Sequence, residues 1–243
     1  MSVLDPLVIW HDAECGSYTA DLPLWRALAS ESPGPVLDVG AGSGRVALDL
    51  ARGGVAVTAL DREPALLHAL TARADAEGLE VPVVCADAAG FDLPSDFALV
   101  LVPMQTIQLL PGAGARRGFL DSARRHLRPG GRLAMALAPG VEPFEPGSVT
   151  LPDPDVAEHD GHSYLSQPVA VRRAGGFLEL ERRRDTVRAD GTRGSERDLI
   201  RLAELDPDDV EREGIEAGFT ADARRTIPET TRHVGSLVVV FRA

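Results

Sequence analysis

Lysine is absent from the sequence, so all 25 basic residues are arginine. This absence excludes Schiff-base lysines, pyridoxal enzymes and the lysine of a phosphate-binding P-loop. Cys15 and Cys85 are far apart, which permits one disulfide but favours two idle thiols, and we predict that no metal is bound. No apolar run is long enough to span a membrane, and the N-terminus lacks a basic signal region. We therefore expect a cytoplasmic protein without a membrane partner.

The sequence also has fewer basic than acidic residues, 25 against 37. The formal net charge is −12, and a phosphate backbone is bound by clustered cations, so we expect no nucleic-acid partner. The hydrophobic fraction of 44% and the charged fraction of 26% are ordinary for a globular protein. A chain of 243 residues suits one large domain better than two small ones, so we predict a single domain over 1–243.

Apolar, β-branched runs alternate with amphipathic stretches between Val36 and Ala138, which is typical of parallel strands joined by crossover helices. The same texture returns near the C-terminus, with a helix capped by Asp206 and two strands. The pattern predicts an α/β fold with a doubly wound sheet. Its first five strands are expected at 36–39, 55–60, 81–86, 97–102 and 131–138, and its first three helices at 45–52, 64–77 and 115–127.

Two further regions interrupt or precede this pattern. Residues 1–33 predict an N-terminal helical cap, and residues 141–205 an insertion before the final helix and strands. The first part of the insertion is rich in proline and acid and lacks a period, so we expect an irregular excursion there. From His162 to Leu205 three extended segments are separated by GG and ADG turns, which predicts an antiparallel β meander.

The run VLDVGAGSGR places Gly40, Gly42 and Gly44 after a buried strand and at the start of a helix. Glycine lets the backbone turn tightly and approach a ligand, with the helix N-terminus facing it. A dinucleotide fingerprint needs a glycine or another small residue at position 45, where this chain has Arg45. The loop therefore predicts another ligand, or else only a tight strand-to-helix turn.

Acidic residues end the next two predicted strands. Asp61 stands where a carboxylate can accept both hydroxyls of a ribose, although it could also cap the helix that begins at Pro64. Asp87 follows the third strand and could reach the same ligand, or serve only as a turn residue. Three consecutive strands that each end in glycine or acid indicate a ligand site at the carboxyl edge of the sheet.

In this order and spacing, VLDVGAGSGR, VTALDREPALL, VVCADAAGFDL and LRPGGRLAMAL resemble class I S-adenosylmethionine-dependent methyltransferases over roughly residues 35–138. The resemblance implies a Rossmann-like, seven-stranded sheet of order 3-2-1-4-5-7-6 whose last strand is antiparallel. It also implies S-adenosylmethionine as the cofactor, with its methionine part packed against the loop that contains Gly40, Gly42 and Gly44.

The resemblance implies further cofactor contacts. Asp61, with Arg62 beside it, would hold the ribose hydroxyls, and Asp87 and the amide of Ala88 would read the adenine edge. In similar enzymes a tyrosine of an N-terminal helix lies near the cofactor carboxylate, and Tyr18 is the candidate here, with a packing role as the alternative.

The segment PMQTIQLL, which follows the fourth strand, faces the transferable methyl group in this family. It contains neither a base-methylating motif nor an acid to hold magnesium, and it resembles the corresponding stretch of small-molecule methyltransferases. Met104 and Gln108 would then line the cofactor; alternatively, a helix packs Met104, Ile107 and Leu110 into the core.

The predicted function is methyl transfer to a nitrogen or oxygen of a small metabolite, with the insertion serving as a substrate lid. His162 and Tyr164 could reach the acceptor, but no catalytic base can be named. Arg172, Arg173 and arginines 182–184 look like a basic patch, for which strand alternation favours a solvated or dimer-facing role, so a homodimer stays open. The alternatives are a nicotinamide-dependent oxidoreductase and a non-catalytic cofactor- or partner-binding protein.

Overall fold

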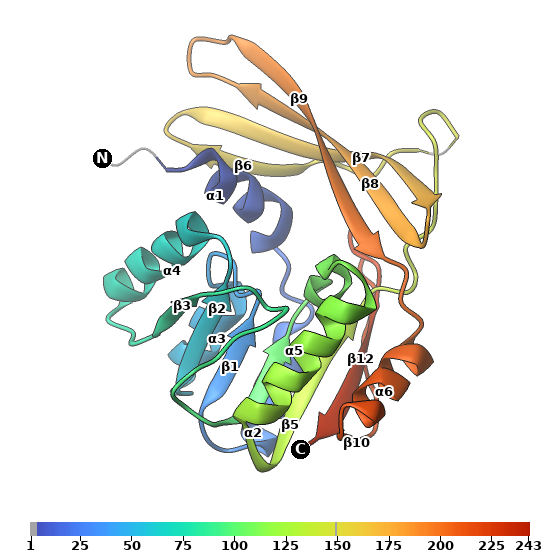
Figure 1. The fold of residues 1–243 in the computed structure, drawn as a ribbon. Coiled ribbons are helices and arrows are strands. Elements are labelled where there is room, and N and C mark those ends of the chain that lie inside the picture. The colour runs from blue at the N-terminus through green and yellow to red at the C-terminus, as the bar shows by residue number, and fades with distance from the viewer. Residues whose placement is uncertain (1–3, 149) are drawn as a thin grey trace. The chain divides into compact units, whose positions relative to one another are not determined.

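The computed structural model of the protein describes residues 4–148 and 150–243. The chain divides into two compact units (Figure 1). The large unit consists of residues 19–140 and 205–243, and the small unit of residues 1–18 and 141–204. The chain passes from one unit to the other after Tyr18, Gly140 and Glu204. Each unit is described by itself below.

The large unit is built on one mixed sheet. Its strands lie side by side in the order β10-β12-β5-β4-β1-β2-β3, and β11 also pairs with β12. All neighbouring pairs from β3 to β5 are parallel, whereas β12 runs antiparallel to β5. The predicted strand order is confirmed, with β12 as the antiparallel last strand. The bounds are β1 Val36–Val39, β2 Val57–Asp61, β3 Val83–Cys85, β4 Phe97–Val102, β5 Leu127–Leu137, β10 Thr220–Ala221, β11 Arg225–Ile227 and β12 Ser236–Arg242.

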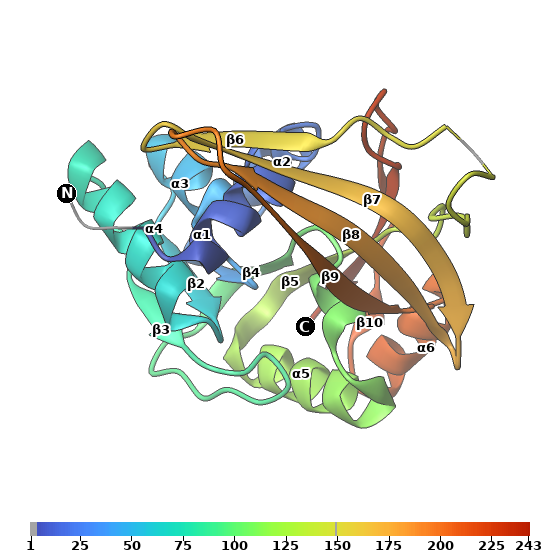
Figure 2. The ribbon, with the colours of Figure 1, turned by 90° about the horizontal axis from the view of Figure 1, so that it is seen from above.

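Helices cover both faces of this sheet. The ribbon shows α5 and α6 in front of the sheet and α2 and α3 behind it (Figures 1 and 2). Phe119 of α5 and Phe241 of β12 are fully buried in the core on the α5 side. The bounds are α2 Leu22–Glu31, α3 Arg45–Arg52, α4 Pro64–Glu77, the 3-10 helix η2 Thr106–Leu109, α5 Gly112–His126 and α6 Pro207–Glu216. As predicted, the Asp206 side chain caps α6 by accepting from the amide of Asp208.

One predicted boundary of the large unit is wrong. The fifth strand was expected to begin at residue 131, after a helix that ends at 127, but β5 already begins at Leu127. Leu127 pairs with Phe97, and the register shifts before Leu99 pairs with Arg132. This bulge accommodates Pro129, which has no amide hydrogen to donate to the ladder.

The small unit is a four-stranded antiparallel sheet with an N-terminal helix (Figure 2). Its strands follow one another in chain order, and the helix α1 continues into a short π-helix, η1. The predicted meander is thus confirmed, and both α1 and η1 contact β6 and β7. The bounds are α1 Pro6–His11, η1 Asp12–Gly16, β6 Asp155–His159, β7 His162–Ala174, β8 Phe177–Val187 and β9 Arg193–Ala203.

The strand β6 lies in the segment that was expected to be irregular. It pairs with β7 through a two-residue turn, Asp160 and Gly161, whose φ angles are 49° and 75°. Two consecutive positive φ angles make the hairpin turn that Asp-Gly favours. The Asp-Gly dipeptide is present in the sequence, but the prolines and acids before it led to the prediction of an irregular segment in place of the short edge strand β6.

The arginines of β8 correct a second prediction. Arg182 and Arg184 have side chains only 9% and 16% exposed, so a solvated or dimer-facing role is wrong for these two, whereas the Arg173 and Arg183 side chains are exposed. Arg184 donates to both carboxylate oxygens of Glu14 in η1, at 2.8 and 3.0 Å. Arg182 pairs with Asp155 of β6 and donates to the hydroxyl of Ser166. These buried contacts hold the N-terminal segment and the edge strand against β7 and β8.

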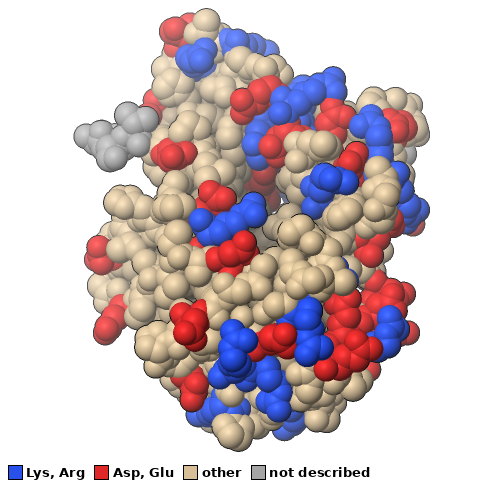
Figure 3. Space-filling view, in the orientation of Figure 1, with Lys and Arg blue, Asp and Glu red and all other residues tan. Residues whose placement is uncertain are grey.

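Exposed charges of both signs are interspersed over the surface. On the face drawn in Figure 3, arginine side chains lie among aspartate and glutamate side chains. Among the residues that the structure describes, no helix combines the length and the apolar character needed to cross a bilayer.

We expect Glu14→Ala to lower the free energy of unfolding by about 3 kcal/mol, because Arg182 and Arg184 each lose a buried carboxylate partner and keep only Asp155 and Asp198. The measurement is urea unfolding followed by circular dichroism. The matched control is Glu142→Ala, which removes an exposed carboxylate of the small unit and should change stability by less than about 0.5 kcal/mol. Equal losses in the two variants would contradict a structural role for Glu14.

Candidate cofactor site

The loop between β1 and α3 has a conformation that requires glycine. Gly40, Gly42 and Gly44 have φ angles of 72°, 56° and 99°, a region that side-chain-bearing residues rarely adopt. A Cβ on Gly40 would lie 2.4 Å from Cγ2 of Thr106, which follows β4. The loop therefore passes close against the segment after β4, and the N-terminus of α3 stands at its end.

Asp61 joins this loop to the end of β2. It is only 9% exposed, and one of its carboxylate oxygens accepts from the amide of Gly42 at 2.8 Å. The other oxygen accepts from the amide of Glu63 at 3.0 Å, just before α4. Each oxygen retains a second lone pair, so Asp61 orders both loops and can still accept hydroxyl groups of a ligand.

The other predicted residues after β2 and β3 are more exposed. Arg62 has a side chain 70% exposed, paired with Glu63 at 3.3 Å. Asp87 accepts from the amide of Ala89 at 2.8 Å, as a turn residue does, and Ala88 is half-buried. The amide of Ala86 donates to the carbonyl of Asp61, so the ends of β2 and β3 are adjacent.

The segment after β4 packs in part into the core, and its contact with the cofactor stays a prediction. Met104 has a left-handed backbone with φ of 53°, a conformation that costs about 1–3 kcal/mol for such a residue and is typical of functional sites. Gln108 is 2% exposed, and its side-chain carbonyl accepts from the amide of Ala138 at 2.9 Å, which joins η2 to the end of β5. Ile107 and Leu110 pack into the core, as expected from the alternative prediction of a core-facing helix.

The structure also shows site residues that the sequence analysis missed. Arg45, the first residue of α3, donates to both carboxylate oxygens of Asp21 at 2.6 and 2.7 Å, and Asp21 also accepts from the indole of Trp25. Asp38 lies in β1, two residues before Gly40, and is 1% exposed. An acid within the apolar run VLDV was the signal that could have identified it.

Asp38 occupies an unusual electrostatic position. Burial raises its pKa from 3.8 to about 7, against the opposing effect of the Arg45 guanidinium and with a further increase from the Asp61 and Asp21 carboxylates. Within the described residues, no side chain donates a hydrogen bond to either carboxyl oxygen of Asp38, and the backbone amide of Ala47 lowers its pKa only in part. The glycine loop thus lies next to a buried acid that titrates near neutral pH.

Nine of the ten predicted cofactor residues belong to the large unit, at or beside the carboxyl ends of β1 to β4. Strand pairing brings these ends together, because β1 lies between β2 and β4, and β2 pairs with β3. Tyr18 is buried in the small unit, and its contact with the cofactor stays a prediction.

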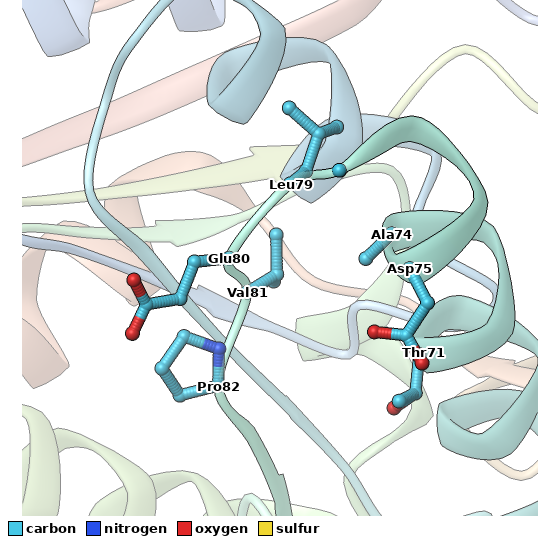
Figure 4. Close-up of a pocket in the computed structure, with 8 residues that line it drawn as sticks. Thr71, Ala74, Asp75, Leu79, Glu80, Val81 and Pro82 are labelled. Atoms are coloured by element: carbon cyan, nitrogen blue, oxygen red, sulfur yellow. The ribbon is translucent and has the colours of Figure 1, made fainter.

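A surface depression elsewhere in the large unit has no part in this site. It is lined by the end of α4 and by residues 78–82, including Thr71, Asp75 and Glu80 (Figure 4). These residues precede β3, so the depression lies at the opposite edge of the sheet from the glycine loop.

The carboxyl edge fits the cofactor that the sequence implies. The glycines leave the loop without side chains where a ligand would approach, and Asp61 is an oriented carboxylate suited to a pair of hydroxyls. The buried acid Asp38 can balance positive charge near the loop. S-adenosylmethionine carries both features, a ribose and a cationic methionine part.

Comparison with known proteins agrees with this geometry. Residues 36–131 match a family model described as a methyltransferase domain. A curated relative, protein-L-isoaspartate O-methyltransferase of Methylorubrum extorquens (strain PA1), is 36% identical over 127 residues, which cover 52% of this chain and 49% of the relative. The match thus spans about half the length of that protein.

Solved structures resemble the whole chain. The SAM-bound amino pentose methyltransferase CalS10 of Micromonospora echinaspora matches with a TM-score of 0.73, 20% identity and coverage of 100% of both chains. The sugar N-methyltransferase KedS8 of Streptoalloteichus sp. matches with a TM-score of 0.73 and 20% identity, over 100% of this chain and 95% of that chain. The glycopeptide N-methyltransferase MtfA is 27% identical, with a TM-score of 0.60 over 90% of this chain and 86% of that chain.

Residues 36–131 thus match a methyltransferase domain, and the fold of the chain is that of class I S-adenosylmethionine-dependent methyltransferases. The resemblance drawn from the sequence is confirmed, and so is S-adenosylmethionine as the cofactor of the class. The roles of individual cofactor residues stay predictions.

We expect Asp61→Ala to weaken S-adenosylmethionine binding by about 1–3 kcal/mol, because the ribose hydroxyls would lose a charged acceptor. Titration calorimetry measures this change, and thermal unfolding checks that the variant is folded. Asp61→Asn is the informative companion, since it keeps an oxygen acceptor and should lose less. Unchanged affinity in the folded alanine variant would refute the ribose assignment.

Proposed function

We propose that this protein transfers the methyl group of S-adenosylmethionine to a nitrogen or oxygen atom of a small metabolite by in-line displacement. The observation that supports this proposal most directly is the glycine loop joined to Asp61 at the carboxyl edge of the sheet. The loop conformation, the oriented carboxylate and the buried acid together suit this cofactor.

When bound, the cofactor supplies a methyl group on a positively charged sulfur, which is already a good leaving group. The protein therefore has to hold and align the reactants, which can contribute about 7–11 kcal/mol to lowering the barrier. Rigid placement of Gly40 against Thr106 and of Gly42 against Asp61 provides that alignment on the cofactor side. Exclusion of water keeps the acceptor lone pair available.

The acceptor is proposed to be a small molecule with an amine or a hydroxyl group. CalS10, KedS8 and MtfA are described as amino pentose, sugar N- and glycopeptide N-methyltransferases, which favours a nitrogen acceptor. The relative from Methylorubrum is an O-methyltransferase, so oxygen acceptors belong in the same test. An amine needs only to be neutral, whereas a hydroxyl benefits from a general base.

The two alternative functions are less well supported. A dinucleotide-binding oxidoreductase has a sheet of order 3-2-1-4-5-6 and a small residue where this chain has Arg45; here β12 is antiparallel and stands next to β5. A non-catalytic cofactor-binding protein would bind S-adenosylmethionine without turnover. Screening amines and hydroxyl compounds for release of S-adenosylhomocysteine tests the proposal, and cofactor binding with no turnover for any compound would favour the non-catalytic alternative.

We further propose that the small unit contributes to acceptor recognition, in keeping with the lid predicted from the sequence. The side chains of His162 and Tyr164 have no hydrogen-bond partner among the described residues. Tyr164 is held edge-on against Trp10 with ring centroids 5.3 Å apart, and His162 lies 6.5 Å from Tyr164 by the same measure. Fixed rings with unused polar atoms suit the binding of a polar substrate.

The double variant His162→Ala, Tyr164→Phe should lower kcat/KM for the acceptor at least tenfold, about 1.4 kcal/mol, and leave cofactor affinity unchanged. Both values can be measured with the best acceptor from the screen, and the exposed His68→Ala of α4 is the control. Wild-type kcat/KM in the double variant would remove these residues from acceptor recognition.

We expect methyl transfer to survive treatment with EDTA, because the described part of the chain contains no group of three His, Cys, Asp or Glu side chains that could hold a metal. Initial rates before and after dialysis against the chelator measure this. Loss of activity that magnesium restores would overturn the metal-free mechanism.

A further inference from the structure

A buried acid beneath the glycine loop is not used in the proposed methyl transfer. Asp38 is 1% exposed near the end of β1, and no side chain within the described residues donates a hydrogen bond to its carboxyl oxygens. The backbone amide of Ala47, in the first turn of α3, favours its ionised form, so the carboxyl faces the helix N-terminus that adjoins the loop.

The surroundings of Asp38 contain too little positive charge to balance it. Three charged side chains act on it: Arg45 of α3, Asp61 of β2, and Asp21, which precedes α2. Arg45 is the one cation among them, and Asp21, which is fully buried, takes both of its terminal nitrogens in a bidentate pair. An ionised Asp38 would therefore be an uncompensated buried charge, which is strongly disfavoured.

A bound ligand can supply the missing charge. The methionine part of S-adenosylmethionine carries an ammonium group and a sulfonium, and the resemblance stated above places this part against the glycine loop. A cation that comes close to a buried carboxyl favours its ionised form.

We propose, on the basis of the proposed function, that S-adenosylmethionine binding is linked to proton release: Asp38 is partly protonated in the free protein and ionises when the cofactor binds. The O–H bond of the carboxyl breaks, the proton passes to the solvent buffer, and the carboxylate balances the positive charge of the cofactor. Asp38 acts here as a positioning residue, which sets the pH dependence of binding and takes no part in the transfer of the methyl group.

The linkage has a definite sign. Burial raises the pKa of Asp38 in the free protein to about 7, and a cation lowers it in the complex. Affinity for the cofactor should therefore rise with pH and level off above pH 7. Below pH 7 it should fall by up to about tenfold per pH unit, until the pKa of the complex is reached.

Titration calorimetry at pH 7 in buffers of different ionisation enthalpy counts the protons directly. The wild-type protein should release about 0.5 proton per cofactor bound, because half of the Asp38 carboxyls are protonated at a pH equal to the pKa. Asp38→Asn should release none and should bind with an affinity that is the same at pH 6 and pH 8. The matched control is Asp75→Asn, which removes an exposed carboxylate from α4 (Figure 4) and should behave as the wild type.

A second measurement does not depend on a folded Asn variant. In wild-type protein labelled with ¹³C at the aspartate carboxyl carbons, one resonance should titrate near pH 7 in the free state and stay ionised from pH 6 to pH 8 in the complex. Cofactor binding without proton release, or equal release by wild type and a folded Asp38→Asn variant, would overturn the linkage and leave the proposed function intact. Absence of cofactor binding at every pH would overturn the proposed function and this inference together.

Discussion

The amide of Gly42 donates a hydrogen bond to the carboxylate of Asp61, and the geometry of the candidate site depends on this contact. It joins the loop after β1 to the loop after β2 across a parallel strand pair, whose register brings both loops to one edge. The second oxygen of Asp61 holds the amide of Glu63 and so defines the start of α4. A single carboxylate therefore orders two loops while keeping lone pairs for a ligand.

Charge beneath the loop is the second constraint on this site. Burying Asp38 raises its pKa, because a carboxylate in an apolar environment is poorly solvated. The nearby cation Arg45 is engaged with Asp21, a contact that also ties α2 to the start of α3. Folding favours the neutral form of Asp38, because its pKa is higher in the folded than in the unfolded chain. The resulting contribution to stability is fully present below the ordinary pKa of 3.8 and is lost as the pH rises through about 7.

Beside the buried apolar residues of α1, polar contacts contribute to holding the small unit together. Its apolar cluster is small, with Val171, Leu178 and Leu202 as the buried members. Glu14 in the N-terminal segment binds Arg182 and Arg184 of β8, although these residues lie far from it in the sequence. Residues 4–18 are thus part of the same compact unit as the β6 to β9 sheet.

The sequence by itself determined most strands and helices of the large unit, the glycine loop and the acids that follow its strands, because strand periodicity, glycine spacing and capping are local patterns. The strand order was implied by the resemblance to a known family. Only the tertiary structure decided the roles of Arg182 and Arg184, whose burial depends on a carboxylate from the other end of the chain. The same holds for Asp38, since the pKa of a carboxyl depends on its solvation and on charges that the fold brings near it. Local patterns specify which elements form, whereas burial and charge compensation are properties of the assembled chain.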